Sequence, residues 1–553
     1  MGLRPARVLA HSLVVLRLIN SVPRCGAHPQ WHLGWRKILG MTFDAFFACA
    51  MGERPYEFQR RMALEEWPAV LVAPTGLGKT AAVVIGWLWR RWKEREVTPR
   101  RLALCLPMRT LVEQAEGDVQ SWLAKLHESG DRWSGSEDLP GPDDVHVLMG
   151  GQEQDRGPPA WGRNPERPAI LIGTQDMLLS RALMRGYGMS RFRWPVEFAL
   201  LHTDTQWVFD EVQAMGAGMT TSAQLEGLRP APATVSACRS LWLSATLEPE
   251  WLRTVDHPAP DAVLRVPGDV REDKADPRVT ARRNARKRLS PAVARPEGPG
   301  RKDAEAYARA LAAEVLEAHR PGHTTLVILN TVARAQELYR NLPGTTERLL
   351  LHARFRPAER RAAMHRLRSG PAGRIVVATQ AIEAGVDITS AVLFTELAPW
   401  PSLVQRFGRV NRYGECGEGG AEIRWIDLDD AKGELAGPYP AEELAAARDH
   451  LAGLTDAAPA NLLPAGVGPA ARHVLRRKDL LDLFDSDPDL TGFDIDVSPF
   501  IRDARDTDFQ VFWRDFAALE PVCQPLPRPE ELCAVPIRRA AELLKGRRGW
   551  RLD

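Results

Sequence analysis

The sequence lacks the long apolar runs and paired cysteines that mark membrane proteins and disulfide-stabilised proteins. None of its 553 residues falls in an apolar run of roughly 18, so we expect no membrane-spanning helix. The seven cysteines are scattered, odd in number and never spaced C-x-x-C, which argues against a disulfide framework and a structural zinc site. This cysteine usage fits a reducing compartment, so we expect a cytoplasmic protein.

A strong net charge is also missing. The formal charge is +2, so contact with a nucleic acid would have to come from local basic patches and not from the field of the whole molecule. Most of the cations are arginine, which suits bidentate phosphate contacts but fits a GC-rich genome equally well.

The first 40 residues faintly resemble a signal peptide, with two early arginines before an apolar stretch. His11 and Arg17 interrupt that stretch, and no clean small-residue cleavage site follows. Helical periodicity begins at Met41 and continues to the first motif. We therefore expect residues 1–40 to be an upstream extension, arising from a misassigned start codon.

Short apolar runs alternate with helical patterns in two groups. The first group covers residues 70–73, 102–106, 169–172, 207–209 and 241–244; the second covers 324–329, 374–378, 391–397 and 422–428. Runs of this length bounded by Gly, Pro or polar residues, with helices between them, predict buried strands of parallel sheets and an α/β fold. After about residue 435 the chain turns helical and irregular.

The segment between the two groups is charged and rich in proline and glycine, and we interpret it as a linker or an exposed insertion. It contains the basic run RRNARKR at residues 282–288. This run fits either a nucleic-acid contact or an ordinary solvated loop.

The stretch APTGLGKT, residues 73–80, lies between an apolar strand pattern and a helical one, which is the context a phosphate-binding loop requires. Its glycines allow backbone N–H groups to face phosphates, and the following helix adds its positive dipole end. We expect Lys79 to reach the β- and γ-phosphates of ATP and the Thr80 hydroxyl to bind Mg²⁺. The alternative is a glycine-rich strand–helix turn with an incidental Lys-Thr pair. The predicted ATP-binding residues of this loop are Thr75, Gly76, Gly78, Lys79 and Thr80.

Two adjacent carboxylates, Asp210 and Glu211, end the apolar run at residues 207–209. They repel each other and resist desolvation unless a ligand needs them both. Beside a phosphate-binding loop, Asp210 is predicted to hold Mg²⁺ and Glu211 to orient and deprotonate the attacking water. The metal charge would remove the repulsion. Alone, the pair would equally fit a helix N-cap acid with a solvated neighbour.

Taken together, the motifs over residues 55–414 resemble those of superfamily 2 helicases. In order, they are PYEFQ (55–59), APTGLGKT (73–80), LPMRTLVEQ (106–114), GTQDML (173–178), DEVQ (210–213), SAT (244–246), NTVARAQELY (330–339), ATQAIEAGVDI (378–388) and QRFGRVNR (405–412). The resemblance implies two tandem RecA-like domains that share one nucleotide.

The resemblance also implies a role for each matched residue. Gln59 would recognise the adenine edge, Gln405 would sense the nucleotide, and Asp387 would contact the ribose. Arg409 and Arg412 would reach across the cleft to the γ-phosphate, although a basic solvated loop is the plainer alternative. Coupling of hydrolysis to movement would involve Gln213, Ser244 and Thr246. Phosphates of a nucleic-acid strand would be held by Arg109, Thr110, Gly173, Thr174, Arg354 and Thr379, with helix caps and a surface arginine as the alternatives.

Narrower features resemble the CRISPR-associated helicase of type I systems, namely NTVARAQ, LHARF (351–355), ATQAIEAGVDI and QRFGRVNRYG. That family usually has His where this chain has Gln213. Residues 473–503 are similar to a subtype U, also called G, version. The family's HD nuclease needs an adjacent His-Asp pair, and this sequence contains no such dipeptide. We therefore expect no nuclease activity here, with a separate HD nuclease or a truncated product as the explanations.

The expected organisation is an extension (1–40), a first RecA-like domain (41–255), a linker or insertion (256–302), a second RecA-like domain (303–432) and a mainly helical accessory region (433–553). The expected function is ATP- and Mg²⁺-dependent translocation on single-stranded DNA, 3′ to 5′, on R-loops opened by a CRISPR surveillance complex. The alternatives are another superfamily 2 motor, such as an RNA remodeller or a restriction-type translocase, or an ATP-gated scaffold without productive turnover.

Overall fold

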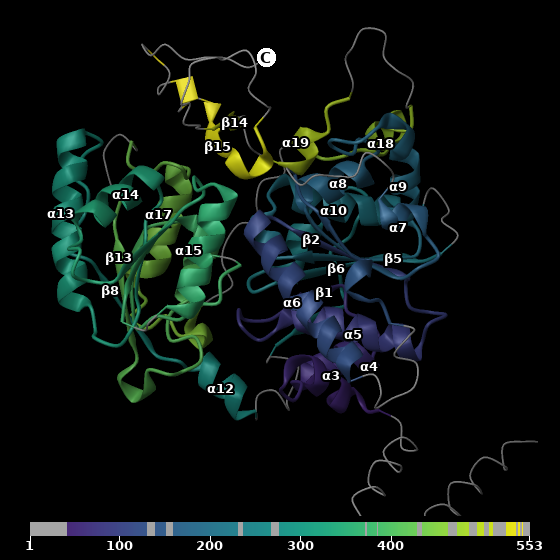
Figure 1. The fold of residues 1–553 in the computed structure, drawn as a ribbon, viewed down its shortest axis with the longest axis horizontal. Helices are drawn as coiled ribbons and strands as arrows, with labels where there is room; N and C mark the ends of the chain where they lie inside the picture. The colour runs from purple at the N-terminus through teal and green to yellow at the C-terminus, as the bar shows by residue number, and fades with distance from the viewer. Residues whose placement is uncertain are drawn as a thin grey trace, which may run out of the picture.

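The computed structural model shows two α/β lobes side by side, joined by a short helical segment (Figure 1). It describes residues 41–129, 139–150, 159–230, 236–266, 276–370, 373–383, 385–428, 434–462, 473–485, 495–502, 508–512, 527–537, 540–541 and 545. The predicted extension, residues 1–40, lies outside this part of the chain.

The first lobe is built on a seven-stranded parallel sheet in the order β3-β4-β2-β5-β6-β1-β7. The strands are β1 (Val70–Val72), β2 (Arg101–Leu106), β3 (Val145–Leu148), β4 (Ala169–Thr174), β5 (Thr205–Asp210), β6 (Cys238–Ser244) and β7 (Val263–Arg265). The helices are α3 (Phe43–Met51), α4 (Glu57–Leu64), α5 (Lys79–Lys93), α6 (Arg109–Glu128), α7 (Ala160–Arg163), α8 (Gln175–Ala182), α9 (Trp194–His202) and α10 (Ala217–Leu228).

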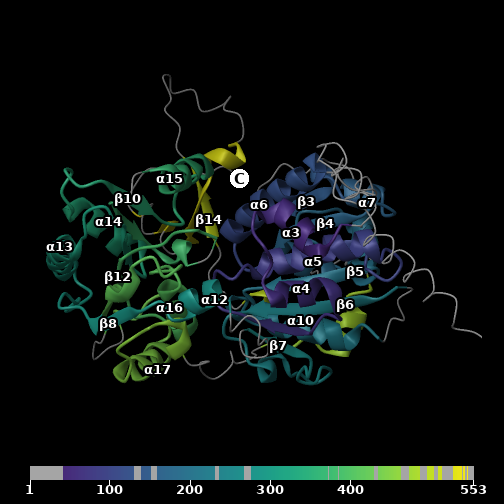
Figure 2. The same ribbon diagram turned by 90° about the horizontal axis from the view of Figure 1, so that it is seen from below.

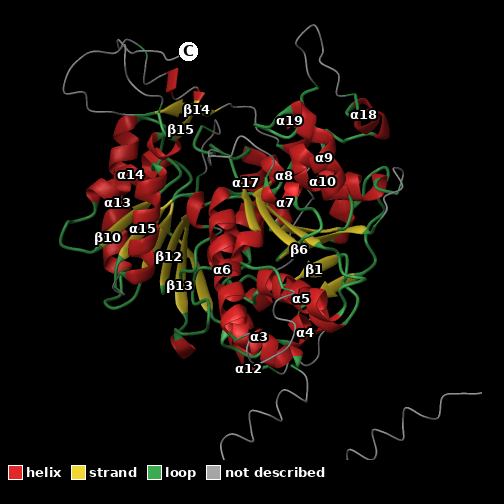
Figure 3. Ribbon diagram, turned by 45° about the vertical axis from the view of Figure 1, so that its right-hand side comes forward, coloured by secondary structure: helices red, strands yellow, loops and turns green. Residues whose placement is uncertain are grey.

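Helices bury both faces of this sheet, as Figure 3 shows. In β2, Leu102 and Leu104 pack with the helices α3 to α6, whereas Ala103 and Cys105 pack with α8, α9 and α10. Alternate residues of a strand point to opposite faces, so a strand covered on both faces becomes a continuous apolar run. This is why the central strands could be predicted from the sequence.

The second lobe has a six-stranded parallel sheet in the order β10-β11-β9-β12-β13-β8. Its strands are β8 (Lys287–Pro291), β9 (Thr325–Ile328), β10 (Arg348–Leu351), β11 (Ile375–Ala378), β12 (Val392–Glu396) and β13 (Ala421–Ile426). One face packs on α13 (Arg301–Ala318) and α14 (Val332–Asn341). The other packs on α15 (Pro357–Ser369), α16 (Trp400–Phe407) and α17 (Ala441–Ala452).

The segment predicted as a linker over residues 256–302 differs from the structure. It contributes β7 to the first sheet and β8 to the second, and α12 (Pro277–Arg283) lies between the lobes in Figure 2. Both strands lie at the edges of their sheets, where polar residues are tolerated. The first lobe therefore extends past residue 255, and the second begins before residue 303.

The C-terminal region spreads over both lobes (Figure 1). Apolar residues of α18 (Arg477–Asp482) and α19 (Ser498–Ile501) belong to the core formed by α8, α9 and α10. An antiparallel pair, β14 (Asp508–Val511) with β15 (Cys533–Pro536), lies by the second lobe, where the Cys533 thiol donates to the Arg354 carbonyl. The region was expected to be mainly helical, and this strand pair was not anticipated. No helix in the described part of the chain is long and apolar enough to cross a membrane.

Candidate active site

The phosphate-binding loop follows β1 and ends where α5 begins. Gly76 and Gly78 have φ of 86° and 73°, which L side chains rarely adopt, and Gly78 is the N-cap of α5. Lys79 is buried, and its Nζ donates to the Ala73 carbonyl at 3.1 Å and lies 3.8 Å from the Glu211 carboxylate. The ammonium group is thus folded over a loop whose backbone has the shape that phosphates require.

Strand order brings the two predicted acids to this loop. Because β1, β6 and β5 are neighbours in a parallel sheet, their carboxyl ends lie at one edge. There the Thr80 Oγ1 donates to Asp210 Oδ2 at 2.7 Å. Burial first, and then the neighbouring Glu211 charge, raises the pKa of Asp210 to about 6.

The oxygen atoms of Thr80 and Asp210 at this edge are suitable ligands for Mg²⁺. A hydroxyl and a carboxylate oxygen are ligand types that this ion accepts. A divalent cation would also relieve the cost of holding Asp210 ionised in a buried place beside a second acid. Thr80 and Asp210 are therefore the residues that would hold it.

Glu211, at this edge of the first sheet, accepts hydrogen bonds from both lobes. Its backbone is left-handed, with φ 52° and ψ 43°. Its Oε2 accepts from Gln213 Nε2 at 2.5 Å and from Gln405 Nε2 of α16 at 3.1 Å. Ser244 Oγ donates to Gln213 at 2.7 Å and accepts from the Thr246 N–H at 3.0 Å. The three residues predicted to couple hydrolysis to movement are thus joined to the predicted base by hydrogen bonds.

Arg412 brings a cation from the second lobe onto the phosphate-binding loop. A Cβ placed on Gly76 would lie 3.0 Å from Arg412 Nε. Nε and Nη1 are buried and have no hydrogen-bond acceptor among the described residues, and the nearest carboxylate oxygen, of Asp387, is 3.4 Å from Nη1. Buried guanidinium donors without acceptors are costly, and a phosphate group would satisfy them.

Arg409 is placed differently. Its Nη1 donates to the Val386 carbonyl at 2.6 Å and its Nη2 to the Glu383 carbonyl at 2.5 Å, both within the second lobe. Burial first, and then nearby Arg412, lowers its pKa to about 10. The structure therefore brings Arg412 to the loop and leaves the guanidinium of Arg409 on its own lobe.

Gln59 uses both ends of its amide within the first lobe. Its Oε1 accepts from the Tyr56 N–H at 2.9 Å, and its Nε2 donates to the carbonyls of Leu77 and Gly78 at 3.3 and 3.2 Å. In this arrangement it braces the phosphate-binding loop. Asp387, expected near the ribose, is exposed and accepts from the Tyr413 hydroxyl at 2.8 Å.

Glycines of the second lobe allow the two lobes to meet closely. A Cβ on Gly408 would lie 2.5 Å from Thr75 Oγ1, and one on Gly385 would lie 2.8 Å from the backbone of Thr110. Thr75, an expected ATP-binding residue, therefore also forms part of the contact between the lobes.

The residues predicted to hold a strand fall into two sets. Gly173, Thr174 and Thr379 are buried at strand ends, and Thr174 is the N-cap residue of α8 without a side-chain cap hydrogen bond. Arg109 is exposed and Thr110 half-buried at the start of α6, and Arg354 is half-buried after β10. Only the second set offers exposed side-chain atoms to a ligand.

Sequence reasoning named Arg282 of α12 only as part of the basic run at residues 282–288 and did not predict its contact with the phosphate-binding loop. Its Nη1 donates to the Gly76 carbonyl at 2.7 Å, so a residue of the supposed linker holds the phosphate-binding loop. Besides the basic run, a signal was the spacing of Arg278 and Arg282, which are four residues apart and lie on one helix face. Among the described residues, no group of three His, Cys, Asp or Glu side chains is placed to bind a metal.

Two family models match the chain in succession. Residues 59–255 match DEAD/DEAH box helicase, and residues 321–415 match CRISPR-associated nuclease/helicase Cas3, C-terminal. The chain therefore combines a region similar to DEAD/DEAH box helicases with a region similar to the C-terminal part of Cas3. The predicted resemblance to the CRISPR-associated helicases is confirmed by these matches.

Individual relatives agree with these matches. The chain is 31% identical over 145 residues to a CRISPR-associated helicase Cas3 of Thermoproteus tenax, covering 26% of this chain and 23% of that one. It is 30% identical over 143 residues to the CRISPR-associated nuclease/helicase Cas3 of Haloferax volcanii, covering 24% and 15%. These aligned segments span less than a quarter of either relative.

Solved structures confirm the predicted pair of RecA-like domains. The crystal structure of T. fusca Cas3 matches with a TM-score of 0.53 at 19% identity, covering 80% of this chain and 57% of that one. At this identity the likeness concerns the fold.

Proposed function

We propose that this helicase is an ATP-dependent motor that moves 3′ to 5′ along single-stranded DNA and acts on R-loops in type I CRISPR interference in the cytoplasm. The observation that carries the proposal is the meeting of the two lobes around one loop. Lys79, Asp210 and Glu211 reach the loop from the first lobe, and Arg412 reaches it from the second with unsatisfied donors. Both lobes would therefore bind one triphosphate.

The chemistry divides among these side chains. Lys79 would exchange the Ala73 carbonyl for phosphate oxygens, a stronger charge-assisted contact. Glu211 would accept a proton from the attacking water, and Arg412 would stabilise the charge that develops on the γ-phosphate. Removing such an arginine typically costs about 10³–10⁵ in rate. Mg²⁺ bound by Thr80 and Asp210 would supply electrostatic stabilisation of the phosphate oxygens.

Movement would follow from the hydrogen bonds at Glu211. Gln405 belongs to the second lobe, so its hydrogen bond to Glu211 exists only while the two lobes are in contact. Gln213 forms hydrogen bonds with both Glu211 and Ser244, which lies at the end of β6. A change in the charge or position of Glu211 during hydrolysis would therefore be felt by both lobes. Arg109, which is exposed, and Arg354, which is half-buried, would hold the strand through its phosphates, which carry no base information.

Two partners follow from the CRISPR context. A surveillance complex would open the R-loop and recruit the motor, and a separate HD nuclease would cut the strand. The relatives named CRISPR-associated nuclease/helicase support this placement.

The test is steady-state ATP hydrolysis with single-stranded DNA, with single-stranded RNA and with no polymer. We expect stimulation by DNA, and we expect Lys79→Ala and Glu211→Gln to abolish turnover. Stimulation by RNA alone would favour the remodeller, and no stimulation by either polymer would favour the ATP-gated scaffold. Unwinding of duplexes with a 3′ or a 5′ overhang then tests the polarity. A requirement for a 5′ overhang would contradict the proposed 3′ to 5′ movement.

A further inference from the structure

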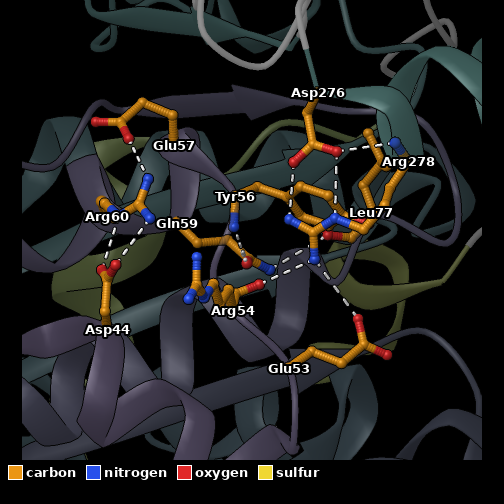
Figure 4. A network of polar contacts seen from close by, with 10 residues as sticks. All are labelled: Asp44, Glu53, Arg54, Tyr56, Glu57, Gln59, Arg60, Leu77, Asp276 and Arg278. Carbon is orange, nitrogen blue, oxygen red and sulfur yellow. Dashed lines mark hydrogen bonds and ion pairs between the residues drawn. The ribbon is translucent and has the colours of Figure 1, made fainter.

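All three guanidinium nitrogens of Arg278, in α12, donate hydrogen bonds along the edge of the guanidinium plane. Its Nε and Nη2 donate to the Asp276 carboxylate at 3.2 and 2.7 Å, and its Nη1 donates to the Arg54 carbonyl at 3.1 Å (Figure 4). Glu53 lies 3.7 Å from the same Nη1. These hydrogen bonds fix the orientation of the guanidinium group. Only the two faces of its plane are left for contacts with other groups.

One of these faces is covered by Tyr56. The Arg278 Cζ lies 4.2 Å from the centre of the Tyr56 ring, which is buried and stacked in turn beside Phe58 at 6.0 Å. The guanidinium therefore rests on a firm aromatic base. Arginine stacks on flat π-systems as well as pairing with anions, so its second face is suited to another planar group.

Arg278 also borders a pocket. Arg278 lines an open pocket of about 1040 Å³ together with Arg54, Pro277, Ala281, Arg282 and Tyr413. The pocket draws on both lobes and on the segment between them.

This pocket adjoins the proposed triphosphate site. Arg282, in its wall, donates to the Gly76 carbonyl, and Gln59 joins Tyr56 to the Gly78 carbonyl. Tyr413, also in the wall, donates to Asp387. A nucleotide whose phosphates lie at Gly76 would direct its ribose and base into this space.

Resting on the proposed function, we infer that Arg278 is the stacking platform for the base of the bound nucleotide. The N–H groups of Arg278 already donate to Asp276 and Arg54. Arg278 therefore contributes stacking on the plane of the base and not hydrogen bonds to the edge of the base. Overlap grows with the area of the base, so Arg278 makes the site prefer purine over pyrimidine nucleotides. It does not itself separate adenine from guanine.

Calorimetric titration of the full chain with ATP, CTP and inorganic tripolyphosphate tests this platform. Arg278→Ala should weaken ATP binding about tenfold, leave tripolyphosphate binding within about twofold, and bring the affinities for ATP and CTP together. Arg278→Lys keeps the charge without the plane and should behave like Arg278→Ala. Arg283→Ala, exposed on the same helix, should match the wild type.

The outcomes separate this inference from the proposed function. Unchanged tripolyphosphate binding shows that the phosphate-binding loop of each variant is intact. Equal losses for ATP and tripolyphosphate, or recovery with lysine, would overturn the platform. If the wild type hydrolyses ATP and Arg278→Ala binds ATP normally, the platform alone fails. If the wild type binds neither ATP nor tripolyphosphate, the proposed function fails as well.

Discussion

At the scale of single residues, the site holds groups in unfavourable states. Glu211 has a positive φ, Asp210 is a buried acid beside another acid, and Arg412 has buried donors without acceptors. Each such feature costs about 1–3 kcal/mol and persists only where the surroundings enforce it. The clustering of these three residues around one loop is expected of a binding site for a charged ligand.

Gln213 is predicted to matter for hydrolysis more than for binding. Gln213→Ala removes the link between Glu211 and Ser244 but leaves the phosphate-binding loop untouched. We expect kcat with saturating single-stranded DNA to fall about tenfold, with the dissociation constant for ATP nearly unchanged. Gln213→His, which restores the residue usual in the family, should recover most of the rate. A large loss of ATP affinity in Gln213→Ala would contradict this role.

Lys287 shows how a buried cation between the lobes affects stability. Burial lowers its pKa from 10.5 to about 8, against the opposing effects of Glu415 and Asp456, and its Nζ donates to the Phe407 carbonyl at 2.8 Å. Because the folded-state pKa lies below the unfolded one, the charged form destabilises the fold. That cost is complete below about pH 8 and disappears as the pH rises toward 10.5.

Lys287→Met should therefore change stability in a pH-dependent way. Relative to the variant, the wild type should gain about 1–2 kcal/mol in unfolding free energy between pH 8 and pH 10. Denaturant unfolding of both proteins at the two pH values measures this difference. A difference that stays constant with pH would show that Lys287 titrates normally.

At the scale of elements, the central strands were predictable and the edge strands were not. Strands such as β2 and β9 are covered on both faces and are apolar after their first residues, Arg101 and Thr325. In β8, by contrast, Lys287 and Leu289 are buried while Arg288 and Ser290 are exposed, so the sequence has the composition of a solvated loop. Its pairing with β13 is set by the tertiary fold and not by local pattern.

The same limit applies to the site. The strand–loop–helix pattern around Lys79 and the acids after β5 are local, so sequence spacing identified them. Arg278 reaches the Tyr56 ring and Arg282 the Gly76 carbonyl because α12 lies between the lobes, a position that no local sequence pattern specifies. For the same reason the sequence did not show that Arg409 would bind carbonyl groups of its own lobe.

The C-terminal helices are predicted to be part of the first lobe's core. Leu483 is 1% exposed in that core, whereas Leu481 on the same helical stretch is 60% exposed. Leu483→Ala should lower the unfolding free energy by about 2–4 kcal/mol, and Leu481→Ala by less than about 0.5 kcal/mol. Chemical denaturation compares the two. Equal effects would mean that this helix does not pack on the lobe in solution.

At the scale of the whole molecule, two lobes meet through small residues and long cations. Gly385 and Gly408 allow backbone approach, while Arg360 forms an ion pair with Glu113 across the cleft. The C-terminal region contacts both lobes, with α19 on α8 and α10 and α17 on α16. Any relative motion of the lobes must therefore be accommodated at these contacts.

The central claim is that one triphosphate is bound by both lobes. It is tested most directly by steady-state ATP hydrolysis of Arg412→Ala with saturating single-stranded DNA, next to a calorimetric measurement of ATP binding. We predict a fall in kcat of about 10³-fold or more, with ATP binding weakened far less. Hydrolysis at the wild-type rate would contradict the claim, since the first lobe would then be sufficient by itself.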